Sequence, residues 1–178
     1  AGHDTSFSVV RYGNVMGSRG SVIPHFLSLD KDKLLPITDV RMTRFMLTLE
    51  EGVDLVWRAF DGMRGGEIYV KKIPSIKVTD IAKAIRPDND YEVVGLRPGE
   101  KIHEQMIGIE DAPFTYEYQN YFKILPAINN WHSDPYRIDN GVLVDSNFTY
   151  SSDNNTDWMS VKILQNWINK NKSRIGKI

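Results

Sequence analysis

Short apolar runs alternate along the first part of the chain with segments whose apolar residues recur at helical spacing. Four runs predict strands: Phe7–Arg11, Arg44–Leu47, Glu67–Val70 and Tyr91–Val94. Three intervening segments predict helices: Ser21–Leu29, the residues that follow Thr48, and the residues that follow Thr79, which we expect to cap its helix. This alternation of strands and helices is typical of an α/β protein.

The helix after Thr48 carries the clearest pattern. Thr48 and Glu51 have the spacing of a capping box, and Gly65 and Gly66 mark its end. Its apolar positions predict a face that packs in the core: Val53, Val56, Trp57 and Phe60. We expect Trp57 and Phe60, like Trp167 further along, to be core residues and not a platform for stacking bases.

The pattern weakens after Val94. Arg97–Lys101 predicts a turn that leads into a short helix carrying Ile102 and Met106. Residues 111–155 show little periodicity, which predicts irregular structure ordered by packing or by a partner. A last helix is expected from Trp158 to about Lys170, capped by Thr156 or Asp157, with one apolar face: Val161, Leu164, Trp167 and Ile168.

Composition narrows the class of protein. The chain has 178 residues, of which 41% are hydrophobic and 25% charged, and we expect a single α/β unit over residues 1–178. A net charge of -1 gives no bulk attraction to nucleic acid. The absence of cysteine excludes a disulfide framework and a thiolate metal site, and agrees with a cytoplasmic protein. We expect no membrane span and, from the scattered histidines, no metal.

A glycine-rich polar loop, Arg11–Gly20, follows the first apolar run. In α/β proteins a loop at the carboxyl end of a strand is a common place for a ligand. Asn14 presents an amide that can donate to and accept from a sugar hydroxyl or a phosphate oxygen. The simpler interpretation is that Gly13 and Asn14 form a tight turn.

Four segments together resemble the signatures of one family: Phe7–Gly20, Ile37–Phe45, Gly95–Glu104 and Tyr150–Trp158. They are similar to inverting UDP-N-acetylglucosamine 4,6-dehydratases, which are lyases of the extended short-chain dehydrogenase/reductase superfamily. The resemblance implies the carboxyl-terminal part of such an enzyme, with late Rossmann strands and a small α/β substrate-binding domain. It also implies surface-polysaccharide biosynthesis in bacteria.

Two motifs of the complete enzyme do not occur in the sequence. The glycine-rich cofactor turn is missing, and no tyrosine is followed four residues later by lysine. We therefore expect that the amino-terminal NADP-binding half is absent, that this chain holds no catalytic residue, and that it is inactive alone. NADP is the cofactor implied for the intact enzyme, and this chain by itself is not expected to bind it.

The resemblance also implies residue roles. The UDP-sugar would contact Asn14, Thr38, Arg97, Glu100, Asn154, Asn155 and Thr156, and the cofactor would lie along Val15, Met16, Gly17, Ser18 and Arg19. Arg97, on a turn fixed by proline and glycine, suits the diphosphate. Glu100 would accept from a hydroxyl or orient Arg97, or it is simply an exposed carboxylate. One of Arg41 and Arg44 would face the nucleotide, unless they are surface cations or pair with Asp39.

Two other interpretations stay open. The chain could be a non-catalytic sugar-nucleotide-binding or assembly module, or part of another sugar-nucleotide epimerase or reductase of the same superfamily. A buried strand such as Phe7–Arg11 without neighbours would invite pairing with another chain, so a homo-oligomer is expected.

Overall fold

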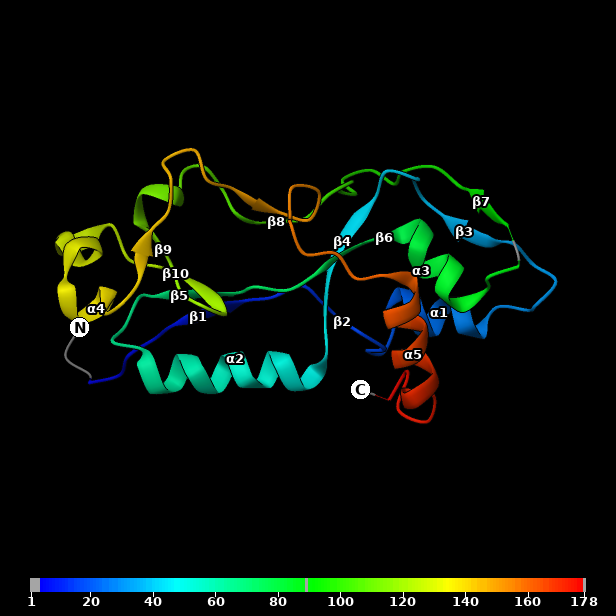
Figure 1. Cartoon of the computed structure of the whole chain (residues 1–178), viewed down its shortest axis with the longest axis horizontal. Coiled ribbons are helices and arrows are strands. Elements are labelled where there is room, and N and C mark those ends of the chain that lie inside the picture. The colour runs from blue at the N-terminus through cyan, green and yellow to red at the C-terminus, as the bar shows by residue number, and fades with distance from the viewer. Residues whose placement is uncertain (1–3, 89, 178) are drawn as a thin grey trace. The chain divides into compact units, whose positions relative to one another are not determined.

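The computed structural model describes residues 4–88 and 90–177 (Figure 1). The chain divides into two compact units, and neither unit is continuous in sequence. The first unit contains the residues up to Tyr12, Glu50–Lys72 and Gln105–Ser151, and the second contains Gly13–Leu49, Ile73–Glu104 and the residues from Ser152 onward. Strands and helices mix in both units, which confirms the α/β class.

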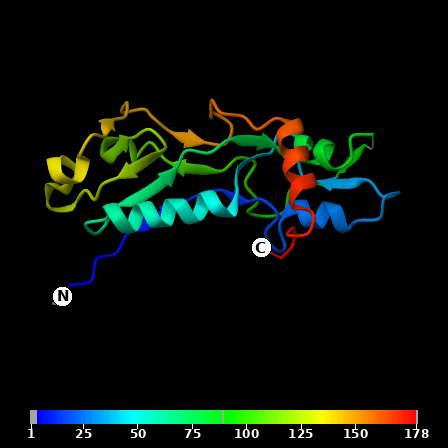
Figure 2. The same cartoon turned by 60° about the horizontal axis from the view of Figure 1, so that its bottom comes forward.

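The first unit is built on a five-stranded sheet in the order β1-β5-β10-β9-β11. These strands are β1 (Val9–Arg11), β5 (Ile68–Lys71), β10 (Tyr121–Ile124), β9 (Thr115–Glu117) and β11 (Val142–Leu143). Strand β1 is parallel to β5, and the other neighbours are antiparallel. Helix α2 (Leu49–Gly62) runs beside β1 and β5 (Figures 1 and 2), and Leu55 and Ala59 pack there against Tyr69.

Helix α2 begins directly after Thr48, as predicted, but its predicted buried face is wrong. Its buried residues are Gly52, Leu55 and Ala59. Trp57 is 63% exposed and Phe60 60% exposed. Leu55 and Ala59 pack against Tyr69 of the sheet, so the stripe that carries Trp57 and Phe60 faces outward.

The segment between residues 111 and 155 is more regular than predicted. Strands β9 and β10 form an antiparallel pair, and short helices lie at Ala112–Phe114 (η1), Ile128–Ser133 (η2) and Pro135–Ile138 (α4). The expected helix around Ile102 and Met106 is wrong: Met106 lies in β8 (Gln105–Ile107), which pairs with β12 (Tyr150–Ser151). The backbone N–H and C=O groups of Gln105–Ile107 are extended and pair with those of β12, so this segment does not form a helix.

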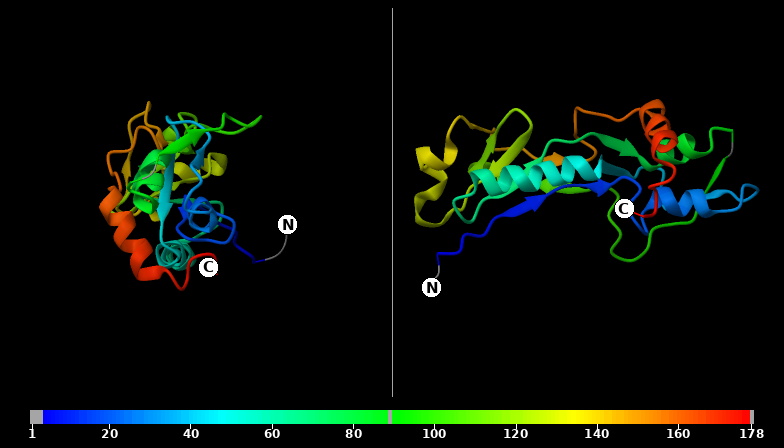
Figure 3. Two further views of the ribbon diagram at one scale, coloured as in Figure 1. Left: turned by 90° about the vertical axis from the view of Figure 1, so that its right-hand side faces the viewer. Right: turned by 90° about the horizontal axis from the view of Figure 1, so that it is seen from below.

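The described residues of the second unit form two small sheets and three helices. Strands β2 (Asn14–Val15), β4 (Thr43–Leu47) and β6 (Ser75–Lys77) form one sheet, and β3 (Leu35–Ile37) and β7 (Tyr91–Val93) the other. Helices α1 (Val22–Ser28), α3 (Val78–Ile85) and α5 (Val161–Asn171) surround a core that includes Ile23, Ile81 and Leu164. Figure 3 shows α5, in red, beside α3.

Two helix starts differ from those predicted. Helix α5 begins at Val161, and its cap is Ser160, whose hydroxyl accepts from the Ile163 amide at 3.3 Å. Thr156 and Asp157 are therefore not its caps, and Trp158 forms a bridge with Ser75 instead. Helix α3 begins at Val78, so Thr79 lies inside its first turn and does not cap it. Among the described residues, no helix combines the length and the apolar character needed to cross a membrane.

Candidate functional site

All residues that the sequence assigned to the UDP-sugar or the cofactor lie in the second unit. Strand β2 pairs with β4, and this pairing brings Asn14 opposite Met46. The start of β4 belongs to the resemblance segment Ile37–Phe45. The Gly95–Glu104 segment reaches the same strand, because the Thr43 amide donates to the Ile102 carbonyl at 3.1 Å. The Ser152 hydroxyl, from the fourth segment, lies 2.6 Å from the Thr43 hydroxyl, so all four resemblance segments meet around β4.

Glu104 is the centre of this meeting point. Its carboxylate accepts from the Phe45 amide at 3.1 Å. When the Asn14 amide is oriented with its nitrogen toward the carboxylate, that nitrogen donates to both Glu104 oxygens, at 2.9 and 3.1 Å. Burial raises the pKa of Glu104, and the Phe45 amide and the Arg44 guanidinium partly oppose that rise. Asn14 therefore has a charged partner within the chain, and Glu104 is a functional candidate that sequence reasoning missed.

A chain of buried and half-buried polar groups lies next to Glu104. The Thr43 hydroxyl is 2.8 Å from His103 Nδ1 and 2.6 Å from the Ser152 hydroxyl. The Ser152 hydroxyl accepts from the Glu104 amide at 2.9 Å, and Ser152 is fully buried. Buried networks of this kind are rigid when every member is bonded. The network fixes the position of Glu104, and only its occurrence inside the resemblance segments could have pointed to it.

Arg97, Glu100 and Thr38 come together at a turn. The Glu100 carboxylate accepts from the Arg97 amide at 3.1 Å and from the Thr38 hydroxyl at 3.4 Å. Gly99 takes a φ of 79°, which this turn requires and which favours glycine. Glu100 thus holds the turn, while the Arg97 side chain is exposed. This arrangement leaves the guanidinium facing solvent, where an anion can reach it.

The two other arginines have partners in the chain. Arg41 donates to both oxygens of Asp39, at 3.0 and 2.7 Å, which lowers the Asp39 pKa to about 2. Arg44 donates to the carbonyls of Ile102, at 2.9 Å, and Lys101, at 3.0 Å. The ion-pair interpretation thus holds for Arg41, and Arg44 fastens the segment that carries Glu104.

The remaining substrate candidates lie before α5. The Asn155 amide nitrogen donates to the carbonyls of Ile73, at 2.8 Å, and Asp157, at 3.0 Å. These bonds make Asn155 an anchor for the turn, whereas Asn154 and Thr156 are exposed.

The loop assigned to the cofactor is only partly accessible. Met16 is 3% exposed, and Gly17, with a φ of 73°, lies so close to Trp167 that a Cβ would be 2.9 Å from its ring. Ser18 is half-buried and Arg19 exposed. Glycine at position 17 therefore serves the packing of α5, and Ser18 and Arg19 are the more accessible members of the loop. In the described part of the chain, no group of three or more metal-ligating side chains gathers.

Comparison with known proteins places the chain in a family. The profile of the polysaccharide biosynthesis protein family matches residues 1–126. Two Campylobacter jejuni proteins named UDP-N-acetylglucosamine 4,6-dehydratase (inverting) are each 49% identical over 93% of this chain and 52% of their own length. A UDP-glucose 4-epimerase of Rickettsia felis is 40% identical over 68% of this chain and 37% of its own length.

The fold agrees with these relatives. The X-ray structure of Pen from Bacillus thuringiensis matches with a TM-score of 0.81 and 30% identity, over 96% of this chain and 52% of Pen. The chain spans about half the length of the dehydratases that it matches. The predicted resemblance is confirmed, and the chain belongs to the polysaccharide biosynthesis protein family, together with inverting UDP-N-acetylglucosamine 4,6-dehydratases.

Proposed function

We propose that this chain is the UDP-sugar-binding portion of an NADP-dependent, C5-inverting UDP-N-acetylglucosamine 4,6-dehydratase. The observation that carries the proposal is the Glu104 network, in which all four segments resembling that enzyme meet around β4. The 49% identity to two proteins of that name supports it.

In this proposal the chain binds and orients the sugar nucleotide. Arg97 holds the diphosphate, since its exposed guanidinium stands on a turn that Glu100 and Gly99 fix. Thr38, Asn154 and Thr156 offer further hydrogen bonds, and Asn14 faces the sugar with its amide already oriented by Glu104.

NADP would supply hydride removal and return in the complete enzyme. From this chain, Ser18 and Arg19 are the members of the Val15–Arg19 loop best placed to contact it, because Met16 and Gly17 are buried. The glycine-rich turn and the tyrosine–lysine pair would come from residues outside this sequence, so we propose that the chain alone does not turn over substrate.

The test is calorimetric titration of the chain with UDP-N-acetylglucosamine. Arg97→Ala should weaken binding by about 1.5–3 kcal/mol, as for a hydrogen bond to a charged group. Lys162→Ala, which removes an exposed cation from α5, should leave the affinity unchanged. Equal affinity in the Arg97 variant and the wild type would remove Arg97 from the site.

A sugar-nucleotide epimerase is the second candidate, favoured by the 40% identity to a UDP-glucose 4-epimerase. Titration with UDP-glucose separates the two. Tighter binding of UDP-N-acetylglucosamine supports the dehydratase, and tighter binding of UDP-glucose supports the epimerase.

We also propose that the protein acts in the cytoplasm as a homo-oligomer. Support for the oligomer comes from the edge position of β1, where Val9 is 52% exposed, and from Phe7, which is 76% exposed. Light scattering of the purified chain tests this, and a monomer at every concentration would contradict it.

A further inference from the structure

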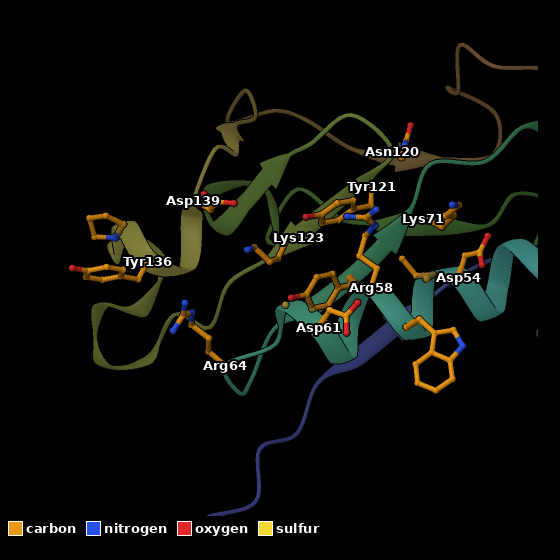
Figure 4. A pocket seen from close by; sticks show the side chains of 15 residues that line it. Asp54, Arg58, Asp61, Arg64, Lys71, Asn120, Tyr121, Lys123, Tyr136 and Asp139 are labelled. Atoms are coloured by element: carbon orange, nitrogen blue, oxygen red, sulfur yellow. The ribbon is translucent and has the colours of Figure 1, made fainter.

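The first unit contains a cavity of about 1080 Å³ that none of the proposed UDP-sugar or NADP residues line. Helix α2, strands β5 and β10 and the start of α4 supply its walls. Its volume lies at the upper end of the range for small-molecule sites, which runs to roughly 1,000 Å³. Figure 4 shows the charged side chains around it.

The floor of the cavity is a square of side chains on two adjacent strands. Lys123 on β10 lies directly opposite Tyr69 on β5, and Tyr121 lies opposite Lys71. Residues two apart on a strand share one face, so all four project from the same side of the sheet. The sheet therefore presents two amines and two phenol rings to the same space.

Lys123 is an unusual residue for this position. It is 6% exposed, and its ammonium lies 4.9 Å from the centroid of the Tyr118 ring. Burial lowers the pKa of Lys123, and the negative charges of Glu67 and Asp139 only partly restore it. No carboxylate in the described part of the chain approaches its nitrogen within ion-pair distance. A buried ammonium without an ion pair destabilises a fold, so its presence calls for a partner.

Tyr69 gives an independent observation. The residue is 1% exposed, and its hydroxyl has no hydrogen-bond partner among the described residues. A buried hydroxyl without a partner is also unfavourable. The Tyr69 hydroxyl therefore has hydrogen-bonding capacity that the described residues leave unused, and Lys123, on the facing strand position, has no ion pair among them.

Charge at the cavity favours an anion. Four cationic side chains line it, Arg58, Arg64, Lys71 and Lys123, against three carboxylates, Asp54, Asp61 and Asp139. Arg58 lies over the Tyr121 ring, 5.3 Å from its centroid. Guanidinium and ammonium groups are the usual partners of phosphate, and flat aromatic faces suit a ring.

We propose that this cavity binds a small molecule that carries a phosphate on a ring, with the phosphate held by Lys123 and the Tyr69 hydroxyl and the ring placed beside the exposed Tyr136. Arg58 and Arg64 complete the cationic surroundings. This site is separate from the proposed UDP-sugar site, because none of its lining residues belongs to the Glu104 network or the Arg97 turn.

The test is titration of the full chain with phenyl phosphate, followed by ³¹P NMR and calorimetry, with phenol as the neutral analogue. Phenyl phosphate should bind and phenol should bind at least about tenfold more weakly, since charge-assisted bonds are lost. Lys123→Met should weaken the binding of phenyl phosphate about 10- to 100-fold. It should not lower the urea midpoint of unfolding, because the substitution removes a buried charge.

Two controls complete the design. Lys72→Met removes a neighbouring lysine that pairs with Glu117 and does not line the cavity, so the affinity should stay unchanged. Arg97→Ala should also leave it unchanged, which separates this site from the proposed function. If Lys123→Met does not fold, Tyr69→Phe provides the same test with an expected loss of several-fold. The proposal is overturned if the wild type does not bind phenyl phosphate. It is also overturned if Lys123→Met and Tyr69→Phe both bind phenyl phosphate as tightly as the wild type does.

Discussion

A buried ion pair holds the entry to strand β5, and we predict that removing its cation destabilises the first unit strongly. Arg137 is 8% exposed and Glu67 1% exposed, and Arg137 Nη1 lies 2.7 Å from Glu67 Oε1. The carboxylate also accepts from the amides of Arg64, at 3.0 Å, and Gly65, at 2.8 Å. The same guanidinium donates to the Gly65 carbonyl at 2.9 Å. The pair therefore fixes the turn at Arg64 and Gly65 that leads into β5.

The expected magnitude follows from what each variant leaves behind. Arg137→Met leaves a buried carboxylate with only two backbone donors, and breaking a buried pair from one side costs about 3–5 kcal/mol. Glu67→Gln leaves Arg137 with only the more distant Asp134 carboxylate, 3.6 Å from its Nε, and should also be destabilising. The double variant buries no charge at the pair, so its loss should be smaller than the sum of the two by at least about 1 kcal/mol.

Urea unfolding followed by circular dichroism measures these free energies. Lys72→Met is the matched control, since it breaks the more exposed Lys72–Glu117 pair and should cost less than about 1 kcal/mol. If the two single losses add to the double loss within about 0.5 kcal/mol, the pair is not coupled and the reasoning fails. The same holds if Arg137→Met costs no more than the control.

Three further predictions concern pH, surface and core. Because burial raises the pKa of Glu104 above its ordinary 4.5, the folded state holds that proton more tightly, and its contribution to stability falls as pH rises from 4.5 through the raised pKa. Glu104→Gln should remove this slope, which urea unfolding at several pH values from about pH 4 upward checks. Replacing the exposed Trp57 and Phe60 by serine should change the free energy of unfolding by less than about 0.5 kcal/mol. The same variant should self-associate less in light scattering, and unchanged association would refute this prediction. Leu164→Ala, at a fully buried position, should cost about 2–5 kcal/mol in urea unfolding, and a loss below 1 kcal/mol would contradict its place in the core.

Periodicity predicts elements well where one apolar stripe is dominant. Helix α5 has a single stripe, and Leu164 and Ile168 are buried on it as expected. Helix α2 has two apolar stripes, and the sequence predicted that the stripe with Trp57 and Phe60 is buried. In the structure the stripe with Leu55 and Ala59 is buried instead. Only the packing partner distinguishes such stripes, and it is a strand distant in sequence.

Polar residues in buried positions explain the other errors. Strand β10 carries Lys123 on an inward face, which hides the alternation that would have predicted a strand. Glu104 gave no signal of its own, because residue type does not show which carboxylate loses its water. Residue types and spacing could identify Arg97 and Asn14 as candidates, but their carboxylate partners depend on tertiary contacts.

The chain passes between the two units at five boundaries, after Tyr12, Leu49, Lys72, Glu104 and Ser151. Each unit is therefore completed by residues from widely separated parts of the sequence. Strand β1 finds its parallel neighbour β5 about sixty residues later, and β10 joins the same sheet about fifty residues after that. A polypeptide cut after Glu104 would remove three strands of the first sheet and the helix α5 that packs in the second core. The two proposed binding sites therefore have to be tested by point substitution in the whole chain, because no single cut isolates either one.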